Sequence, residues 1–197
     1  MTDPAARTRR ALLVVDVQPT FCEGGALAVA GGNDVAARIA AFATAHRDRY
    51  DLIVTTQDWH VDPGNHFSDT PDFVDSWPPH GVAGTAEAEL HPALADLRPD
   101  ASVKKGMYAA AYSGFEGVDA HGRNLATVLA WTGIEEVAVV GIAESHCVKE
   151  TALDAHGCGL RTRVLTDLTV PVDEAQGISA RAVLRERGVA LVASTAL

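Results

Sequence analysis

Short apolar runs rich in β-branched residues alternate with helical patterns along the 197 residues of the chain, and this alternation constrains the fold more than any other feature. The runs that read as strands are 11–17, 52–56, 102–105, 135–143, 162–168 and 189–194. The segments that read as helices run from a cap at Asn33 to His46, over 124–133, from a cap at Ser145 to about His156, and over 173–188. Strands that are apolar throughout need cover on both faces. The sequence therefore predicts an α/β fold, with a doubly wound, mainly parallel six-stranded sheet and helices on both faces.

We expect one domain over residues 1–197, because a chain of this length usually forms a single core. Between the second and third predicted strands lies a long segment, at about 58–86, that is rich in Pro, Gly, Asp and His. Loops of that length in a compact domain are usually functional. This loop is therefore the first place to look for a site.

The charge and cysteine content exclude several classes of function. The net charge is −10 at pH 7, which argues against nucleic acid and anionic membranes as partners. No apolar run reaches transmembrane length, and the run after MTDPAARTRR is too short for a signal-peptide core. Three cysteines without a CxxC pair favour a reducing cytoplasm. The chain could work there as a monomer or as a homo-oligomer.

Four chemically suggestive side chains stand at the carboxyl ends of four predicted strands. Asp16 and Lys105 end strands, whereas Asp58 and Cys147 follow strands. Open parallel sheets bind ligands beyond the carboxyl ends of their strands, near the point where the strand order reverses. We therefore expect all four residues at one edge of the sheet, where they could form a site.

Cys147 is the cysteine most suited to a nucleophilic role. It follows a strand and is expected in the first turn of a helix, where the helix dipole and free N–H groups favour a thiolate and could stabilise an oxyanion. The alternative is a buried structural cysteine, which is the more common fate of a lone cysteine. Cys22 and Cys158 lack such a setting, and we interpret both as structural.

A nucleophilic thiol needs a base and a neighbouring positive charge, and the chain offers both. Asp16 at the end of a buried strand could accept the thiol proton, although it could also be a simple turn residue. Lys104 or Lys105 could supply the ammonium, because alternation along a strand points one inward and the other outward. Periodicity alone does not choose between the two lysines. An Asp, a Lys and Cys147 would together form a triad.

The stretch QDWHVDPGNHF and the WPPH that follows it hold a cluster of potential metal ligands. The four residues are Asp58, His60, His66 and His80. Three imidazoles and one carboxylate suit Zn²⁺, Mn²⁺ or Fe²⁺ better than Ca²⁺ or Mg²⁺. The alternative is a polar loop with unrelated histidines, but half of the eight histidines in the chain would then share it by chance.

Together these residues resemble nicotinamidases, also called pyrazinamidases, of the isochorismatase-like cysteine hydrolase superfamily, which has a Rossmann-like fold. The matching motifs are VVDVQ-x-x-FCEGG (14–25), QDWHVDPGNHFS (57–68), SWPPH (76–80), KG-x-Y-x-x-AYSGFEG (105–117), GIAESHCVKETALDA (141–155) and TRVLTDLT (162–169). They extend along nearly the whole chain. The combination is specific, because the D-x-H-x5-H…PPH set marks the nicotinamidase branch of the superfamily.

The resemblance implies a role for each candidate residue. The triad would be Asp16, Lys105 and Cys147, since the KGxY frame selects Lys105 over Lys104. The metal ligands would be Asp58, His60, His66 and His80. A cis peptide bond would precede Ala143, and the N–H groups of Ala143 and Cys147 would form the oxyanion hole. The residues that would line the ring pocket are Phe21, Trp77, Tyr112 and His146, and Ala143 would bind the substrate through its N–H group.

The activity that the resemblance implies is hydrolysis of nicotinamide, and of pyrazinamide, to the acid and ammonia through a cysteine thioester in NAD salvage. The metal would bind the pyridine nitrogen, or a water beside it, and so position the carboxamide over the thiol. Two alternatives stay open. One is a metal-independent amide or carbamoyl hydrolase of the same superfamily, and the other is a hydrolase in which the metal activates water and Cys147 is structural.

The chain departs from many relatives at two places. Pro19 and Thr20 replace the Asn-Asp of the DVQNDF motif, which puts the side-chain hydrogen bonds of those two residues in question. The AAAY stretch at 109–112 replaces a more varied segment near the ring pocket and could change the tolerance for substituted rings.

Overall fold

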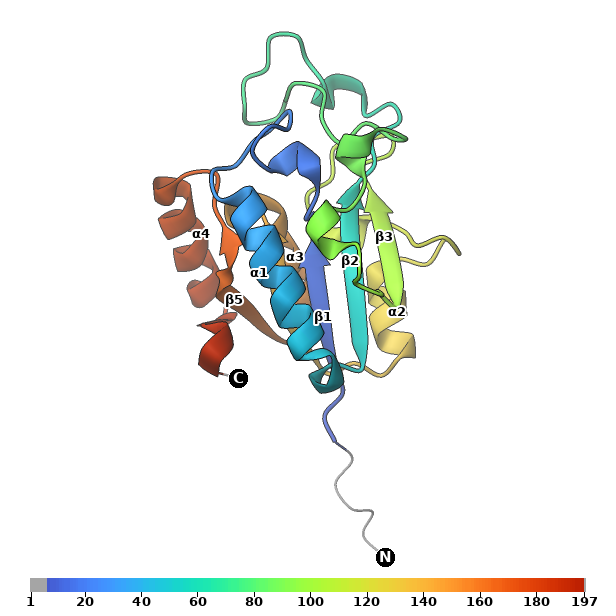
Figure 1. Ribbon diagram of the computed structural model, residues 1–197, viewed down its shortest axis with the longest axis vertical. Coiled ribbons are helices and arrows are strands. Elements are labelled where there is room, and N and C mark those ends of the chain that lie inside the picture. The colour runs from blue at the N-terminus through green and yellow to red at the C-terminus, as the bar shows by residue number, and fades with distance from the viewer. Residues whose placement is uncertain (1–6, 197) are drawn as a thin grey trace, which may run out of the picture.

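The computed structural model describes residues 7–196, which form a six-stranded parallel sheet with helices on both faces (Figure 1). The strands are β1 (Arg10–Val15), β2 (Leu52–Asp58), β3 (Ala101–Lys105), β4 (Glu136–Ile142), β5 (Arg161–Val170) and β6 (Ala190–Val192). Their order in the sheet is β3-β2-β1-β4-β5-β6, and every neighbouring pair is parallel. The predicted fold class is therefore confirmed.

Four α-helices cover the sheet. They are α1 (Gly32–Ala45), α2 (Leu125–Trp131), α3 (Lys149–Gly157) and α4 (Glu174–Glu186). Helix α1 packs on one face through its apolar stripe, whereas α2 and α3 pack on the opposite face, where Leu184 of α4 joins the same core (Figure 1). Each helix thus buries one stripe against the sheet.

The central strand β1 shows why an apolar run without alternation forms a buried parallel strand. Leu12 and Val14 face the core beneath α1, whereas Leu13 and Val15 face the core beneath α2 and α3. All four side chains are fully buried. Since burying an aliphatic side chain stabilises the fold by about 1.5–3 kcal/mol, β1 anchors both layers at once.

The strand order reverses between β1 and β4. After β1 the chain builds β2 and β3 on one side, and it then returns to build β4, β5 and β6 on the other side. The segments that leave β1 and β4 diverge at this switch point, which leaves room for a ligand. The loop between β2 and β3 has no α-helix, and it arches over this edge of the sheet (Figure 1).

Two predicted helix caps are wrong. Asn33 lies inside α1, whose N-cap is Gly31; the Glu23 carboxylate instead accepts the backbone N–H groups of both Gly31 and Asn33. Ser145 caps no α-helix, because residues Glu144–Val148 form one π-helical turn and α3 begins only after it. In α1 a longer-range contact with Glu23 thus replaces the local cap that the sequence suggested, whereas no side chain caps α3.

Among the helices described in residues 7–196, none combines the length and the apolar content needed to cross a lipid bilayer.

Gly141, at a register irregularity between β4 and β5, gives a test of this packing. Its φ is 131°, and a β-carbon there would lie 2.0 Å from the backbone oxygen of Val15. We expect Gly141→Ala to lower the free energy of unfolding in urea by about 3 kcal/mol or more. The control is Gly157→Ala at the end of α3, where a β-carbon meets nothing within 4 Å and the change should stay below about 1 kcal/mol. Equal unfolding midpoints for the two variants would contradict the clash.

Candidate active site

A cavity of about 300 Å³ opens at the carboxyl edge of the sheet, among the segments that follow β1, β2 and β4. Its lining includes all five residues predicted to bind the substrate, which are Phe21, Trp77, Tyr112, Ala143 and His146. The other predicted site residues in the lining are Asp58, His66, His80 and Cys147. The three remaining ones, which are fully buried and outside the lining, are Asp16, His60 and Lys105.

Cys147 lies in the π-helical turn between β4 and α3, directly after a cis peptide bond at Ile142–Ala143. Its Sγ is 3.8 Å from Nζ of Lys105. Burial raises the pKa of the Cys147 thiol well above its ordinary value, and the nearby ammonium offsets only part of that effect. Burial thus acts against the thiolate that the helix start is expected to favour, so a nucleophilic Cys147 would need a base to remove the thiol proton.

Asp16 is placed to be that base. It follows β1 with an unusual φ of 49°, and Thr56 holds it there: the Thr56 hydroxyl donates to Oδ1 at 2.6 Å, and the Asp16 N–H donates to the Thr56 carbonyl at 3.2 Å. Oδ2 is buried without a well-directed hydrogen bond, although it lies 3.0 Å from Nζ of Lys105. Burial raises the pKa of Asp16, which brings its proton affinity closer to that of a thiol.

Lys105 is fully buried and stands between the two halves of the site. Its ammonium forms ion pairs with Asp16 and Asp58 and donates to the carbonyl of Ala111 at 3.1 Å. Burial lowers its pKa, but the two carboxylates raise it more, so that the pKa of Lys105 ends well above its ordinary value and the group stays charged. Lys104 points elsewhere, with its ammonium 3.0 Å from the ring centre of Trp59. The side chain of Lys105, and not that of Lys104, therefore points toward the site.

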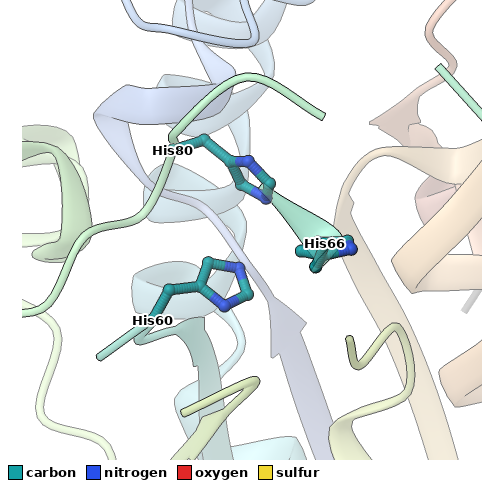
Figure 2. Close-up of side chains that lie close together, drawn as sticks. All are labelled: His60, His66 and His80. Carbon is teal, nitrogen blue, oxygen red and sulfur yellow. The ribbon is translucent and has the colours of Figure 1, made fainter. Parts of the chain in front are cut away.

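The side chains of His60, His66 and His80 lie close together (Figure 2), and those of His66 and His80 line the cavity. One ligand nitrogen from each lies within 4.8 Å of the others, and all three residues are buried. Oδ2 of Asp58 is 3.7 Å from Nε2 of His60 and 3.8 Å from Nε2 of His80. Burial raises the pKa of Asp58, but Lys105 and His60 together lower it more, so that the pKa ends below its ordinary value and the carboxyl stays ionised.

The hydrogen bonds around the histidines leave nitrogen lone pairs free to bind a cation. Nδ1 of His60 lies 2.6 Å from the Gly106 carbonyl, and Nδ1 of His80 lies 2.8 Å from the Pro78 carbonyl. A carbonyl can only accept, so each Nδ1 carries the proton and each Nε2 presents a lone pair. Nε2 of His60 and Nδ1 of His66 are buried without a hydrogen-bond partner. Burial lowers the pKa of His80 to about 4, so its ring is neutral, as metal ligation requires. This donor set fits a divalent metal.

Two supporting residues escaped the sequence analysis although both lie inside matching motifs. The buried Gln18 side chain donates to the carbonyl of Asp58 at 3.0 Å and accepts its N–H at 2.9 Å, which fixes the end of β2. Gly106 has a φ of 72°, and a β-carbon there would lie 2.5 Å from the His60 ring. Only glycine can therefore approach His60 so closely.

The structure shows what Pro19 and Thr20, the two residues that depart from the motif of many relatives, do in this chain. Pro19 begins the short 3₁₀ turn Pro19–Phe21. The Thr20 hydroxyl accepts the N–H of Gly81 at 3.2 Å, so Thr20 ties the segment after β1 to the residue that follows His80. Neither Cys22, which is buried beneath α1, nor the exposed Cys158 lines the cavity.

Glu144 is a further buried residue that the sequence analysis did not single out. It follows Ala143 in the π-helical turn and is 1% exposed. The Thr169 hydroxyl of β5 donates to Oε2 at 2.7 Å, and Nη1 of Arg181 in α4 lies 3.2 Å from Oε1. The turn that carries Cys147 is thus fastened to two other elements by one carboxylate.

Comparisons with known proteins agree with this architecture. Residues 10–196 match the family model described as the isochorismatase domain. The chain is 50% identical over 186 residues to the nicotinamidase/pyrazinamidase of Mycobacterium tuberculosis, in an alignment that covers 94% of this chain and 100% of that protein. The pyrazinamidase of Pyrococcus horikoshii in complex with zinc superposes with a TM-score of 0.82 at 32% identity, covering 94% of this chain and 99% of that one. A protein of L. infantum in complex with nicotinate gives a TM-score of 0.83 at 35% identity, covering 100% of this chain and 98% of that one.

The contact of Glu144 with Arg181 can be tested by stability measurements. Arg181→Met should lower the free energy of unfolding by about 2 kcal/mol or more, because it leaves a buried carboxylate without its counter-charge. Arg181 also pairs with Glu174, whose side chain is 75% exposed. The control Glu174→Gln should therefore change the free energy by less than about 1 kcal/mol. If both variants unfold at the same urea concentration, the buried pair does not hold the turn.

Proposed function

The chain belongs to the isochorismatase family, and on that premise we propose that it is a nicotinamidase, which hydrolyses nicotinamide to nicotinate and ammonia through a thioester on Cys147. The single observation that carries the proposal is the position of the Cys147 thiol. It lies beside the buried Lys105 ammonium, in a cavity that is also lined by the imidazoles of His66 and His80. Pyrazinamide has the same carboxamide on a ring with a nitrogen in the same relative position, so it is a substrate by the same chemistry.

The attack needs a base, a charge and an oxyanion site. Asp16 takes the thiol proton through Oδ2, which has no well-directed hydrogen bond, and the sulfur then bonds to the carboxamide carbon. The carbonyl oxygen becomes an oxyanion, which accepts the N–H groups of Ala143 and Cys147. The Lys105 ammonium stabilises the thiolate while it exists. The proton that Asp16 holds passes to the amide nitrogen, the C–N bond breaks, and ammonia leaves.

Hydrolysis of the thioester repeats these roles with water. Asp16, again a carboxylate, removes a proton from the water that attacks the acyl carbon. The same N–H groups of Ala143 and Cys147 hold the second oxyanion. The C–S bond breaks, the sulfur recovers the proton from Asp16, and nicotinic acid leaves, which loses its carboxyl proton to the solvent and becomes nicotinate. The thiol and the carboxylate thus return to their starting states.

The residues that would hold the metal are Asp58, His60, His66 and His80. A bound divalent cation would supply a Lewis acid for the ring nitrogen of the substrate. We favour zinc, because three imidazoles and a carboxylate suit Zn²⁺ and because the related P. horikoshii pyrazinamidase was solved with zinc; Fe²⁺ and Mn²⁺ accept the same ligand types. The chain's own residues set the distance between the thiol and this cation site.

A metal-independent amide or carbamoyl hydrolase is the alternative within the same family. It would use the same three residues at the end of β1, β3 and β4, but it would leave the buried, unpaired nitrogens of His60 and His66 without a role. The proposed nicotinamidase accounts for both. We place this activity in NAD salvage and in the cytoplasm, where the three cysteines, all free, would stay reduced.

Removal of the thiol tests the nucleophile. Cys147→Ala should reduce ammonia release from nicotinamide on the order of 10⁴-fold or more, because the covalent route is lost. The matched control is Cys158→Ala at an exposed position, which should keep full activity. Full activity in Cys147→Ala would point instead to a water nucleophile activated by the metal.

Removal of a ligand tests the metal site. Purified His66→Ala should contain much less zinc, iron and manganese than the wild type by elemental analysis, whereas His121→Ala, at an exposed position outside the cluster, should contain as much as the wild type. Wild-type protein treated with a chelator should also lose nicotinamide hydrolysis and regain it when zinc is restored. Activity that survives complete removal of the metal would favour the metal-independent alternative.

A further inference from the structure

The cavity above Cys147 has two halves that differ in exposure and chemistry. The inner half holds the polar and reactive groups, which are buried or half-buried: Asp58, His66, His80, Tyr112, His146 and Cys147. All four exposed residues in the lining are apolar: Ala26, Ala28, Phe73 and Val172. We call these four residues, with the half-buried Leu27, the apolar rim. They come from three separate segments of the chain, so their meeting is a product of the fold.

The apolar rim is held in place before any ligand arrives. Phe73 has a φ of 57°, which is rare for a bulky side chain, and Asp72 stabilises the turn by accepting the N–H groups of Val74, Asp75 and Ser76 at 2.9 Å each. The Phe73 ring packs edge-on against Trp77 with 5.9 Å between centroids. At the end of the rim that Val172 forms, its backbone N–H donates to the hydroxyl of Ser145, which lies in the same π-helical turn as Cys147.

Exposed apolar side chains around a cavity usually mark a binding surface. Phe73 is 58% exposed and Val172 is 42% exposed, although both line the cavity. A pyridine carboxamide is one ring and one amide, whereas cavities of about 300 Å³ can accept ligands of drug size. The unsubstituted substrate therefore leaves the apolar rim uncovered.

The chemistry of the site fixes which ring atom faces the rim. The inference rests on the proposed function, in which the carboxamide carbon meets Cys147 and the ring nitrogen faces the histidines. Both groups then lie in the inner half of the cavity. In nicotinamide they flank carbon 2, so the atom opposite to them across the ring, carbon 5, points outward.

We infer that the apolar rim is a subsite for an apolar substituent on carbon 5 of the pyridine ring, so that the enzyme acts on 5-alkyl nicotinamides as a substrate class. A charged or strongly polar substituent finds no partner among the exposed lining residues. An alkyl group bound there would bury apolar surface of Phe73 and Val172, and its own apolar surface would also be removed from water. Both contributions favour binding.

The test compares kcat/KM for 5-propylnicotinamide, 5-methylnicotinamide and nicotinamide, measured by ammonia release. In the wild type, the two extra methylenes of the propyl group should raise kcat/KM over the methyl compound on the order of 10-fold. Phe73→Ser and Val172→Ser should each lower this propyl-to-methyl ratio several-fold. Ile178→Ser, which removes an exposed apolar side chain of α4 outside the cavity, should leave the ratio unchanged.

The outcomes separate this inference from the proposed function. A propyl compound that reacts no faster than the methyl compound in the wild type, or a ratio that stays the same in both rim variants, overturns the subsite while nicotinamide is still hydrolysed. A wild-type enzyme that releases no ammonia from nicotinamide overturns the proposed function itself.

Discussion

The buried ammonium of Lys105 is the interaction on which the rest of the site depends. Its contacts with Asp16, Asp58 and Cys147 join the carboxyl ends of four adjacent strands, and no water reaches it. Taking a charge out of water costs several kcal/mol, and here two carboxylates offset that loss. The sheet register makes this possible, because Asp58 of β2 pairs directly with Lys105 of β3. One lysine thus fixes the relative positions of the proposed base, the proposed nucleophile and the proposed cation site.

Asp58 connects the two chemistries of the site. One of its oxygens pairs with Lys105, and the other faces His60 and His80. The positive charge that stabilises a thiolate on one side therefore also keeps a ligand ionised on the other. Gln18 holds the backbone of the same residue from behind. Rigid support of this kind holds the reacting groups in place before the substrate binds. Less entropy is then lost when the substrate reaches its reactive geometry.

The elements that the sequence predicts best are those governed by local pattern. The apolar runs identify all six strands, and the spacing of charged and histidine residues in motifs identifies the cluster at the sheet edge. The features that escaped prediction depend on contacts between distant segments. Ser145 is a residue type that often caps helices, but its hydroxyl instead accepts the N–H of Val172. Cys147 lies in a π-helical turn where burial raises the pKa of its thiol, opposite to the effect expected of a helix start. Neither burial nor the partner of Glu144 can be read from neighbouring residues.

The strand order also has a consequence for how the protein acquires activity as it is made. Asp16 and Cys147 follow strands that are neighbours in the sheet, yet α1, β2, β3 and α2 lie between these two strands in the chain. Base and nucleophile meet only when β4 docks beside β1, and such distant pairings form late because closing a long loop is entropically unfavourable. A growing chain that has completed β1, β2 and β3 holds the whole cation cluster but no nucleophile. Reactivity therefore emerges only once the second half of the sheet is in place.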